Sequence, residues 1–373
     1  MSKTKTAAAG REPLVRLVKR DDIPRGKAWA IRALAVLLAL LTGALIVLAL
    51  GHNPILVYKD MVLGSLGKAR GIRETAKKAI PLLGAALAIA PAFKMKFWNI
   101  GAEGQILAGG LGATYFALFW ADKLPRPALL LLMCAAGIVC GGLWGLLPAV
   151  FKAKWGTNET LFTLMLNYIV LGFVKYLQAG PWGPDINPAT SYPKIPMFTD
   201  AARLPSVFGV HIGWIFILLL TGAMFWYLKY SKQGYEIAVV GESVRTAQYA
   251  GMSVPKIIMR TMFLSGAVSG FVGFLQVSGA SYTLTENTAG GIGFTAITVA
   301  WLAKLNPFAM IVIAIVLAVL EKGSDTIQTL YQIPASAAEM LTGIILFFML
   351  GCEFFINYRL IFRGKGARGH GRN

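Results

Sequence analysis

Ten apolar stretches, separated by polar segments, follow one another between Ala30 and Ile356. A helix needs about 20 mostly apolar residues to cross the hydrocarbon core of a bilayer, and most of these stretches approach that length. Hydrophobic residues make up 56% of the chain and charged residues only 14%, which is typical of membrane proteins. The sequence therefore predicts an all-α polytopic membrane protein. The predicted crossings are 30–50, 79–93, 100–120, 129–151, 161–179, 212–228, 259–279, 291–305, 308–320 and 337–356.

Some of these stretches are too short for a full crossing. We expect 79–93 and 291–305 to be tilted, broken or re-entrant segments, which membrane proteins tolerate where the backbone is buried in protein. The predicted number of crossings is therefore eight to ten.

Lysine and arginine residues predict the orientation, because cytoplasmic segments carry an excess of them. Both ends are basic, so we expect a cytoplasmic tail at 1–28, a permease-like membrane domain at 29–357 and a second cytoplasmic tail at 358–373. A polar island at 234–259, also basic at its borders, falls on the cytoplasmic side. Segment 52–78 should lie outside yet holds six lysines and arginines, and we expect it to form an amphipathic helix on the membrane surface.

Several classes of function are disfavoured. The net charge of +19 fits topology and attraction to anionic lipid, since no basic patch is interleaved with aromatic residues as in nucleic-acid binding. The glycine–lysine pairs at 26, 67 and 364 lack the following serine or threonine of a phosphate-binding loop. The three cysteines and three histidines have no catalytic or metal-ligand spacing. We expect no ATPase activity of its own, no catalytic residue, no metal, no cofactor and no nucleic acid partner.

Polar side chains inside the apolar stretches are candidates for a solute pathway. The segment FWNIGAEGQ places Asn99, Glu103 and Gln105 around two glycines, and a carboxylate at membrane depth is costly unless it faces a cavity or a partner. The alternative is an interfacial turn with an acidic residue at a helix start. Asn167 and Gln276 complete the predicted set. Further candidates, which could equally hydrogen-bond between helices, are Glu286, Asn287, Asn306 and Glu321.

Three separated segments resemble one family. PLLGAALAIAPAFKMKFWNIGAEGQ, NETLFTLMLNYI and VGESVRTAQYAGMSVPKIIMRTMFLSGAVSGFVG are similar to the permease subunits of bacterial ABC importers for simple sugars and nucleosides, especially those that work with basic-membrane-protein-type lipoprotein receptors. The resemblance implies a type II ABC importer fold of about ten helices in a bacterial plasma membrane. It also implies that 234–259 docks on an ATPase subunit.

The same resemblance suggests residues and partners for coupling. Glu242 and Ser243 depart from the Asn-Pro that is frequent in the family, and Gln248 stands where a small residue is usual. The implied partners are an ABC ATPase, a lipoprotein or periplasmic solute-binding protein, a second permease copy or paralogue, and the bilayer. The residues that match the family's coupling pattern are Gly241, Glu242, Ala247, Ala250 and Gly251.

Two classes of transport remain open at this point. The resemblance favours import of nucleosides, purines foremost, with simple sugars second, and Phe97, Phe274 or Tyr168 could stack on a base. The other class is a secondary transporter in which Glu103, Glu159 or Glu321 carries a proton or binds sodium. Such a carrier should place a basic partner inside the membrane, and none is evident from the residues alone.

Overall fold

The computed structural model describes residues 15–19, 24–183, 185–187 and 192–362. The chain forms two compact units: 1–57 with 336–373, and 58–335. The predicted membrane domain, 29–357, runs through both units, and its bounds stay a prediction. Most of the two predicted tails lies outside the described residues.

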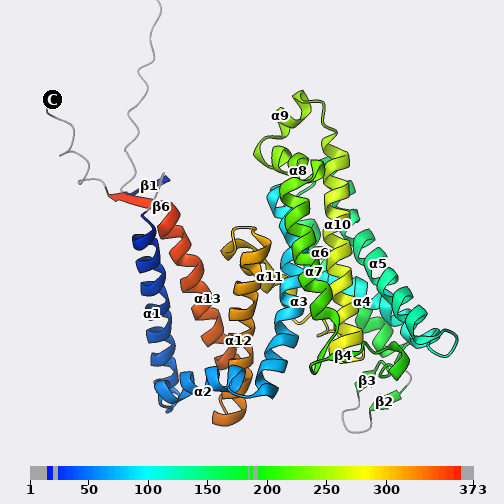
Figure 1. Ribbon diagram of the computed structural model, residues 1–373, viewed down its shortest axis with the longest axis horizontal. Coiled ribbons are helices and arrows are strands. Elements are labelled where there is room, and N and C mark those ends of the chain that lie inside the picture. The colour runs from blue at the N-terminus through cyan, green and yellow to red at the C-terminus, as the bar shows by residue number, and fades with distance from the viewer. Residues whose placement is uncertain (1–14, 20–23, 184, 188–191, 363–373) are drawn as a thin grey trace, which may run out of the picture. The chain divides into compact units, whose positions relative to one another are not determined.

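The first unit is a pair of helices closed by a small sheet. Helices α1 (Arg25–Ala49) and α13 (Ala335–Asn357) are flanked by strands β1 (Val15–Lys19) and β6 (Tyr358–Phe362), which pair antiparallel. An ion pair of 2.7 Å joins Arg32 to Glu353. The start of α1 and the end of α13 therefore lie at the same end of this unit (Figure 1), as an even number of crossings requires.

Helix α2 (Pro54–Leu66) contains the division between the units, and the second unit holds the other elements. Its long helices are α3 (Ala69–Lys94), α4 (Ala102–Phe119), α5 (Arg126–Trp155), α6 (Glu159–Ala179), α7 (Gly213–Tyr230), α10 (Val254–Leu275) and α12 (Pro307–Tyr331). Its short elements are β2 (Asp185–Asn187), β3 (Tyr192–Lys194), η1 (Asp200–Ala202), β4 (Ser206–Val207), β5 (Val210–His211), α8 (Lys232–Glu242), α9 (Val244–Tyr249), the π-helical η2 (Gln276–Ser281) and α11 (Ile292–Leu302).

Every predicted crossing coincides with a helix, but 79–93 is not a broken segment: it belongs to α3, a continuous helix of 26 residues that is long enough to cross a membrane. Eight helices among the described residues are long and apolar enough to cross a membrane, and α4 and α11 account for the other two stretches. Strands in the described chain are confined to three two-stranded ladders. The prediction of an all-α, multi-helix membrane fold is confirmed.

Glycines bring α5 and α10 into backbone contact at the centre of the second unit. A Cβ added to Gly141 would stand 2.5 Å from the carbonyl oxygen of Gly266, and one on Gly270 would overlap the carbonyl of Gly137. Helix α4 joins this seam, because a Cβ on Gly109 would overlap the backbone of Gly270. Small residues spaced four apart permit such close packing in membranes.

The second unit has different elements at its two ends (Figure 1). Helices α8 and α9 stand at one end and the hairpins β2–β3 and β4–β5 at the other, with α7 running between them. At the α8 end, the ammonium group of Lys94 on α3 donates to the carbonyl of Leu228 on α7 at 2.7 Å. We call α8–α9 the arm.

Candidate functional site

A buried amide pair holds the turn between α3 and α4. Asn99 donates from Nδ2 to Ser265 Oγ on α10 at 3.0 Å and to Gln105 Oε1 at 3.3 Å, and Gln105 Nε2 donates back to Asn99 Oδ1 at 3.2 Å. Asn99 also accepts the Gly101 amide at 2.9 Å. Both side chains are at most 1% exposed. The two amides therefore fix the α3–α4 turn against α10.

Asn167 on α6 fastens the first turn of α4 from the opposite side. Its Oδ1 accepts the Gly104 amide at 2.9 Å, and its Nδ2 donates to the Ile100 carbonyl at 3.0 Å. The approach requires glycine, since a Cβ on Gly104 would stand 2.7 Å from Asn167 Oδ1. Asn167 is buried as well.

Glu103 joins α4 to the start of α11. Its Oε1 accepts the Gly291 amide and its Oε2 the Gly293 amide, both at 2.7 Å. The first amides of a helix have no partner within the helix, and a negative charge there is favoured by the helix dipole. Glu103 thus satisfies two of the free donors of α11.

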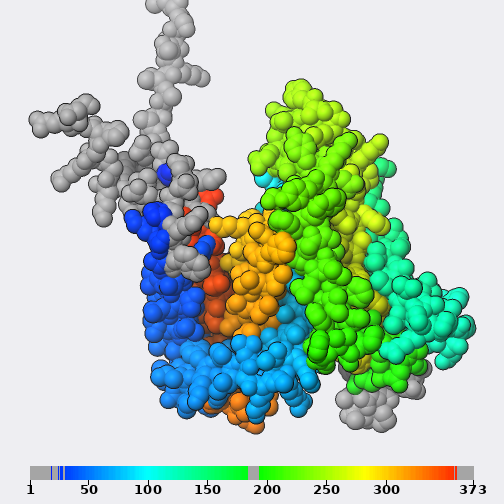
Figure 2. Space-filling model, in the orientation of Figure 1, coloured from blue at the N-terminus to red at the C-terminus, as the bar shows by residue number. Residues whose placement is uncertain are grey.

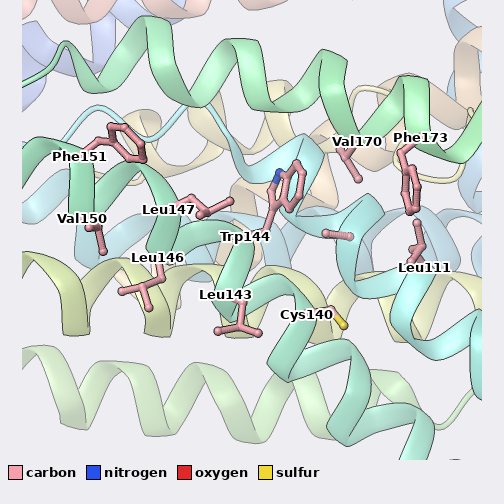
Figure 3. Close-up of a pocket in the computed structure, with 11 residues that line it drawn as sticks. Leu111, Cys140, Leu143, Trp144, Leu146, Leu147, Val150, Phe151, Val170 and Phe173 are labelled. Carbon is pink, nitrogen blue, oxygen red and sulfur yellow. The ribbon is translucent and has the colours of Figure 1, made fainter.

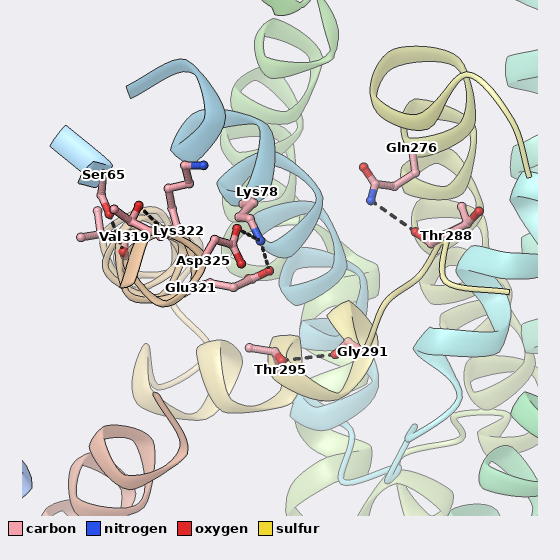
Figure 4. A network of polar contacts seen from close by, with 11 residues as sticks. Ser65, Lys78, Gln276, Thr288, Gly291, Thr295, Val319, Glu321, Lys322 and Asp325 are labelled. Atoms are coloured by element: carbon pink, nitrogen blue, oxygen red, sulfur yellow. Dashed lines mark hydrogen bonds and ion pairs between the residues drawn. The ribbon is translucent and has the colours of Figure 1, made fainter. Parts of the chain in front are cut away.

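Gln276 is the first residue of η2, the π-helical segment that continues α10. Its Nε2 donates to the Thr288 carbonyl at 3.3 Å, which ties α10 to the segment leading into α11 (Figure 4). Helix π-bulges occur often at functional sites. Glu103 and Gln276 therefore both bond to residues 288–293 at the start of α11, whereas the buried Asn99, Gln105 and Asn167 hold the α3–α4 turn. A solute-pathway role for all five stays a prediction.

The carboxylates considered for ion coupling all have partners. Glu159 pairs with Lys152 at 2.7 Å. Lys78 on α3 reaches Glu321 at 2.6 Å and Asp325 at 3.1 Å on α12 (Figure 4). Sequence reasoning missed the Lys78 pairs because 243 positions separate Lys78 from Glu321. They also account for part of the basic charge of segment 52–78, since acidic groups of α12 neutralise it.

The arm has a buried face and an exposed face. Of the predicted coupling residues, Gly241 and Ala247 are buried, while Glu242, Ala250 and Gly251 are exposed. Ala247 packs with Met95 and Phe97 in one apolar cluster, completed by Ala92, Ala149, Ile237, Val240, Val254, Ile257 and Met262.

The outer face of the arm carries apolar side chains. Tyr249 is 92% exposed, Tyr235 64% and Val244 46%. The arm projects from its end of the second unit (Figure 2). Exposed aromatic side chains such as these two tyrosines are enriched in protein–protein interfaces.

The aromatic residues differ from those expected. Phe97 and Phe274 are each only 4% exposed, so neither presents a face to a base in this structure; Tyr168 is exposed. The sequence analysis missed the pair Trp98 and Trp301, which stack with ring centroids 5.6 Å apart and are each about half exposed.

An apolar cavity of about 440 Å³ lies between α4, α5 and α6 (Figure 3). It is lined by side chains such as Leu111, Leu147 and Phe173, and the indole N–H of Trp144 has no hydrogen-bond partner among the described residues. A hydroxyl-rich solute would find almost no hydrogen-bonding group here. This cavity therefore does not fit the solute class considered above.

Residues 71–350 match the family described as "Branched-chain amino acid transport system / permease component". The chain belongs to this permease family. The permease is 31% identical to the nucleoside ABC transporter permease protein NupB of Lactococcus lactis, over 88% of the permease and 92% of NupB. It is also 31% identical to the guanosine ABC transporter permease protein NupP of Bacillus subtilis, covering 85% and 91% of the two chains.

A third relative transports a different class of solute by name. The permease is 30% identical to the glucose ABC transporter permease protein TsgB13 of Haloferax volcanii, over 93% of each chain. The expected resemblance to ABC importer permeases is confirmed by these matches. Of these three relatives, two are named for nucleosides and one for glucose.

Proposed function

We propose that this permease is the membrane subunit of an ATP-driven importer of nucleosides, purine nucleosides foremost, in a bacterial plasma membrane. The observation that carries the proposal is the occupied helix start: Glu103 already binds the Gly291 and Gly293 amides, so the positive end of α11 offers little to an anionic solute. Of the predicted pathway amides, that of Gln276 lies at the segment leading into α11, where it donates to the Thr288 carbonyl, and an uncharged amide suits a neutral base-bearing solute. Relatives named for nucleosides and guanosine support the same solute class.

The arm is the proposed docking surface for an ABC ATPase. In the orientation predicted from the lysine and arginine residues, the arm and both tails would be cytoplasmic. The β2–β3 and β4–β5 hairpins would then face outward, toward a lipoprotein or periplasmic solute-binding protein. Exposed Tyr235, Val244 and Tyr249 would contact the ATPase. A second permease copy or a paralogue would complete the pathway in the bilayer.

A short mechanical connection links the arm to the solute site. The buried face of the arm packs on Met95 and Phe97, and Glu103 follows Met95 by eight positions along the turn. The amides of Asn99 and Asn167 make this turn rigid. Movement of the arm when ATPase subunits close would therefore be transmitted through the turn to Glu103 and the start of α11.

The test is reconstitution of the permease with its ATPase subunit and receptor in vesicles. Uptake of labelled guanosine should be saturable and ATP-dependent, and it should persist when the proton gradient is collapsed at constant ATP. The permease alone should hydrolyse no ATP. Uptake that vanishes with the gradient would favour a secondary transporter. Stronger competition by ribose or glucose than by any nucleoside would assign the permease to sugars, the second candidate that the glucose-transporting relative favours.

A further inference from the structure

A polar pocket of about 470 Å³ lies between α2, the start of α3 and the end of α12. It is at the end of the second unit opposite the arm, since α3 runs from this pocket to Lys94 beside the arm. Three basic side chains line it, Lys68, Arg70 and Lys322, together with three carboxylates and two threonines. The pocket contains part of the basic segment 52–78, which the predicted topology did not explain.

The acidic residues of the pocket have partners, whereas the basic ones do not. Each carboxylate is bound by a side chain that does not line the pocket, at 2.6 to 3.1 Å: Asp60 by Tyr331, Glu74 by Lys77 and Asp325 by Lys78. No described residue gives Lys68, Arg70 or Lys322 a hydrogen-bond or ion-pair partner. In Figure 4 the ammonium group of Lys322 points away from the pairs that Lys78 makes. Three uncompensated cations around one cavity favour an anion with several acceptor oxygens.

The pocket lies at the level of the lipid headgroups. The sequence of α3 has no charged residue between Lys78 and Lys94. Measured back from Lys94 at 1.5 Å per residue, a hydrocarbon core of about 30 Å ends about 20 residues earlier, near Glu74. Arg70 lies about 6 Å beyond Glu74, within the polar layer of about 5–7 Å that borders the core. The anion that a membrane supplies at this level is the phosphate of a phospholipid, and basic pockets between membrane helices bind such headgroups.

Apolar side chains border the same pocket. Leu63 of α2 and Leu330 of α12 line it and are 49% and 61% exposed. Val62 and Leu66, also on α2, are about half exposed as well. Exposed apolar side chains beside basic groups match the acyl chains and the headgroup of one lipid, as on an amphipathic helix at a membrane surface. A carboxylate of a water-soluble protein would satisfy the cations alone.

We infer that this pocket binds the phosphate group of a phospholipid, whose charge is neutralised by Lys68, Arg70 and Lys322. The lipid bridges α3 and α12, because Lys68 stands at the start of α3 and Lys322 belongs to α12. Since it binds the folded chain, it stabilises the permease by mass action. The inference does not depend on the solute or on the proposed function.

The test measures lipid binding to the purified, delipidated permease in detergent, with dioleoyl phosphatidylglycerol as the probe. Native mass spectrometry gives the dissociation constant, and thermal unfolding gives the stabilisation. Arg70→Gln and Lys322→Gln should each raise the dissociation constant about tenfold, as expected for the loss of a charged hydrogen bond. Arg73→Gln is the matched control, because Arg73 is exposed on the same helix but lies against Gly209, outside the pocket. It should bind the lipid as the wild type does, and equal affinity of all three variants overturns the inference.

Further arms identify the source of the anion. Dioleoylglycerol has the same acyl chains without the phosphate and should not stabilise the wild type, and millimolar inorganic phosphate should stabilise it less than the lipid does. Equal stabilisation by inorganic phosphate would assign the pocket to a free anion, and equal stabilisation by dioleoylglycerol would remove the role of the phosphate; either result overturns the inference. Receptor binding that weakens about tenfold in Arg70→Gln at unchanged lipid affinity would instead assign the pocket to the solute-binding protein.

Discussion

Gly293 lies directly against Glu103. Its amide donates to the carboxylate at 2.7 Å, and a Cβ at position 293 would overlap the Glu103 backbone. The contact joins the starts of two helices, α4 and α11, through one side chain. Both the glycine and the carboxylate are therefore needed at this junction.

Glu103→Ala should destabilise the permease. The substitution leaves the Gly291 and Gly293 amides at the start of α11 without an acceptor. We therefore expect the free energy of unfolding to fall by about 3 kcal/mol. Glu103→Gln keeps one acceptor oxygen and should lose about half as much. Denaturant titration of the purified protein in detergent measures both.

Glu286→Gln is the control for this position. Glu286 pairs with Lys175 at 2.9 Å with both side chains about half exposed, so losing this ion pair should lower the free energy of unfolding by less than about 1 kcal/mol.

Guanosine uptake by Glu103→Gln should also stay independent of the proton gradient. If uptake by the wild-type permease needed the proton gradient, and if this uptake were lost in Glu103→Gln, Glu103 would instead be identified as a proton carrier.

Tyr249→Ala should weaken ATPase binding without unfolding the arm. The side chain is 92% exposed, so its removal should change the free energy of unfolding by less than about 0.5 kcal/mol. If it anchors the ATPase, the dissociation constant should rise about tenfold or more. Titration of the ATPase subunit onto permease in nanodiscs measures the constant. Tyr176→Ala, 63% exposed on α6, is the matched control, and equal effects of the two variants would contradict docking on the arm.

Gly270→Val should prevent close packing of α5 and α10. The added side chain would overlap the carbonyl of Gly137, and we expect a loss of about 3 kcal/mol or more in the free energy of unfolding. Gly172→Ala on α6 meets nothing within 4 Å and should be neutral or stabilising by about 0.5 kcal/mol. Thermal unfolding of the two purified variants separates the outcomes. A stable Gly270→Val permease would show that the helices can move apart.

The stability of the permease should fall in acid because of His211. This side chain is 3% exposed, neither ring nitrogen has a hydrogen-bond partner among the described residues, and burial with the nearby charge of Lys77 lowers the pKa from 6.5 to about 4. Between pH 6.5 and about pH 4 the imidazole of His211 is protonated in the unfolded chain but stays neutral in the native protein. The free energy of unfolding should therefore fall as the pH drops through this range, by at most about 3 kcal/mol.

His211→Phe tests the origin of that slope. The variant should lose the part of the pH dependence between pH 6.5 and 4, because phenylalanine does not titrate. Unfolding free energies at several pH values in detergent measure the difference. An identical slope in both proteins would place the acid sensitivity at other groups.

Part of the candidate site was predictable from local sequence. A carboxylate beside two glycines, at the start of an apolar stretch, predicted that Glu103 would need a partner at membrane depth. Its partners, the amides of Gly291 and Gly293, lie almost 190 positions away, so no local pattern indicated them. Even longer separations concealed the Lys78–Glu321 pair and the stacking of Trp98 on Trp301.

The sequence by itself determined the class of protein, the family and which stretches form membrane helices, although α3 begins 10 residues before its predicted stretch and α12 ends 11 residues after its own. Hydrophobic length decides which segments enter a bilayer, and this information is local to each segment. Only the tertiary structure decided which polar groups are hydrogen-bonded within the protein interior. Asn99, Gln105 and Asn167 share the composition expected of a solute site, yet their hydrogen bonds are satisfied inside the bundle.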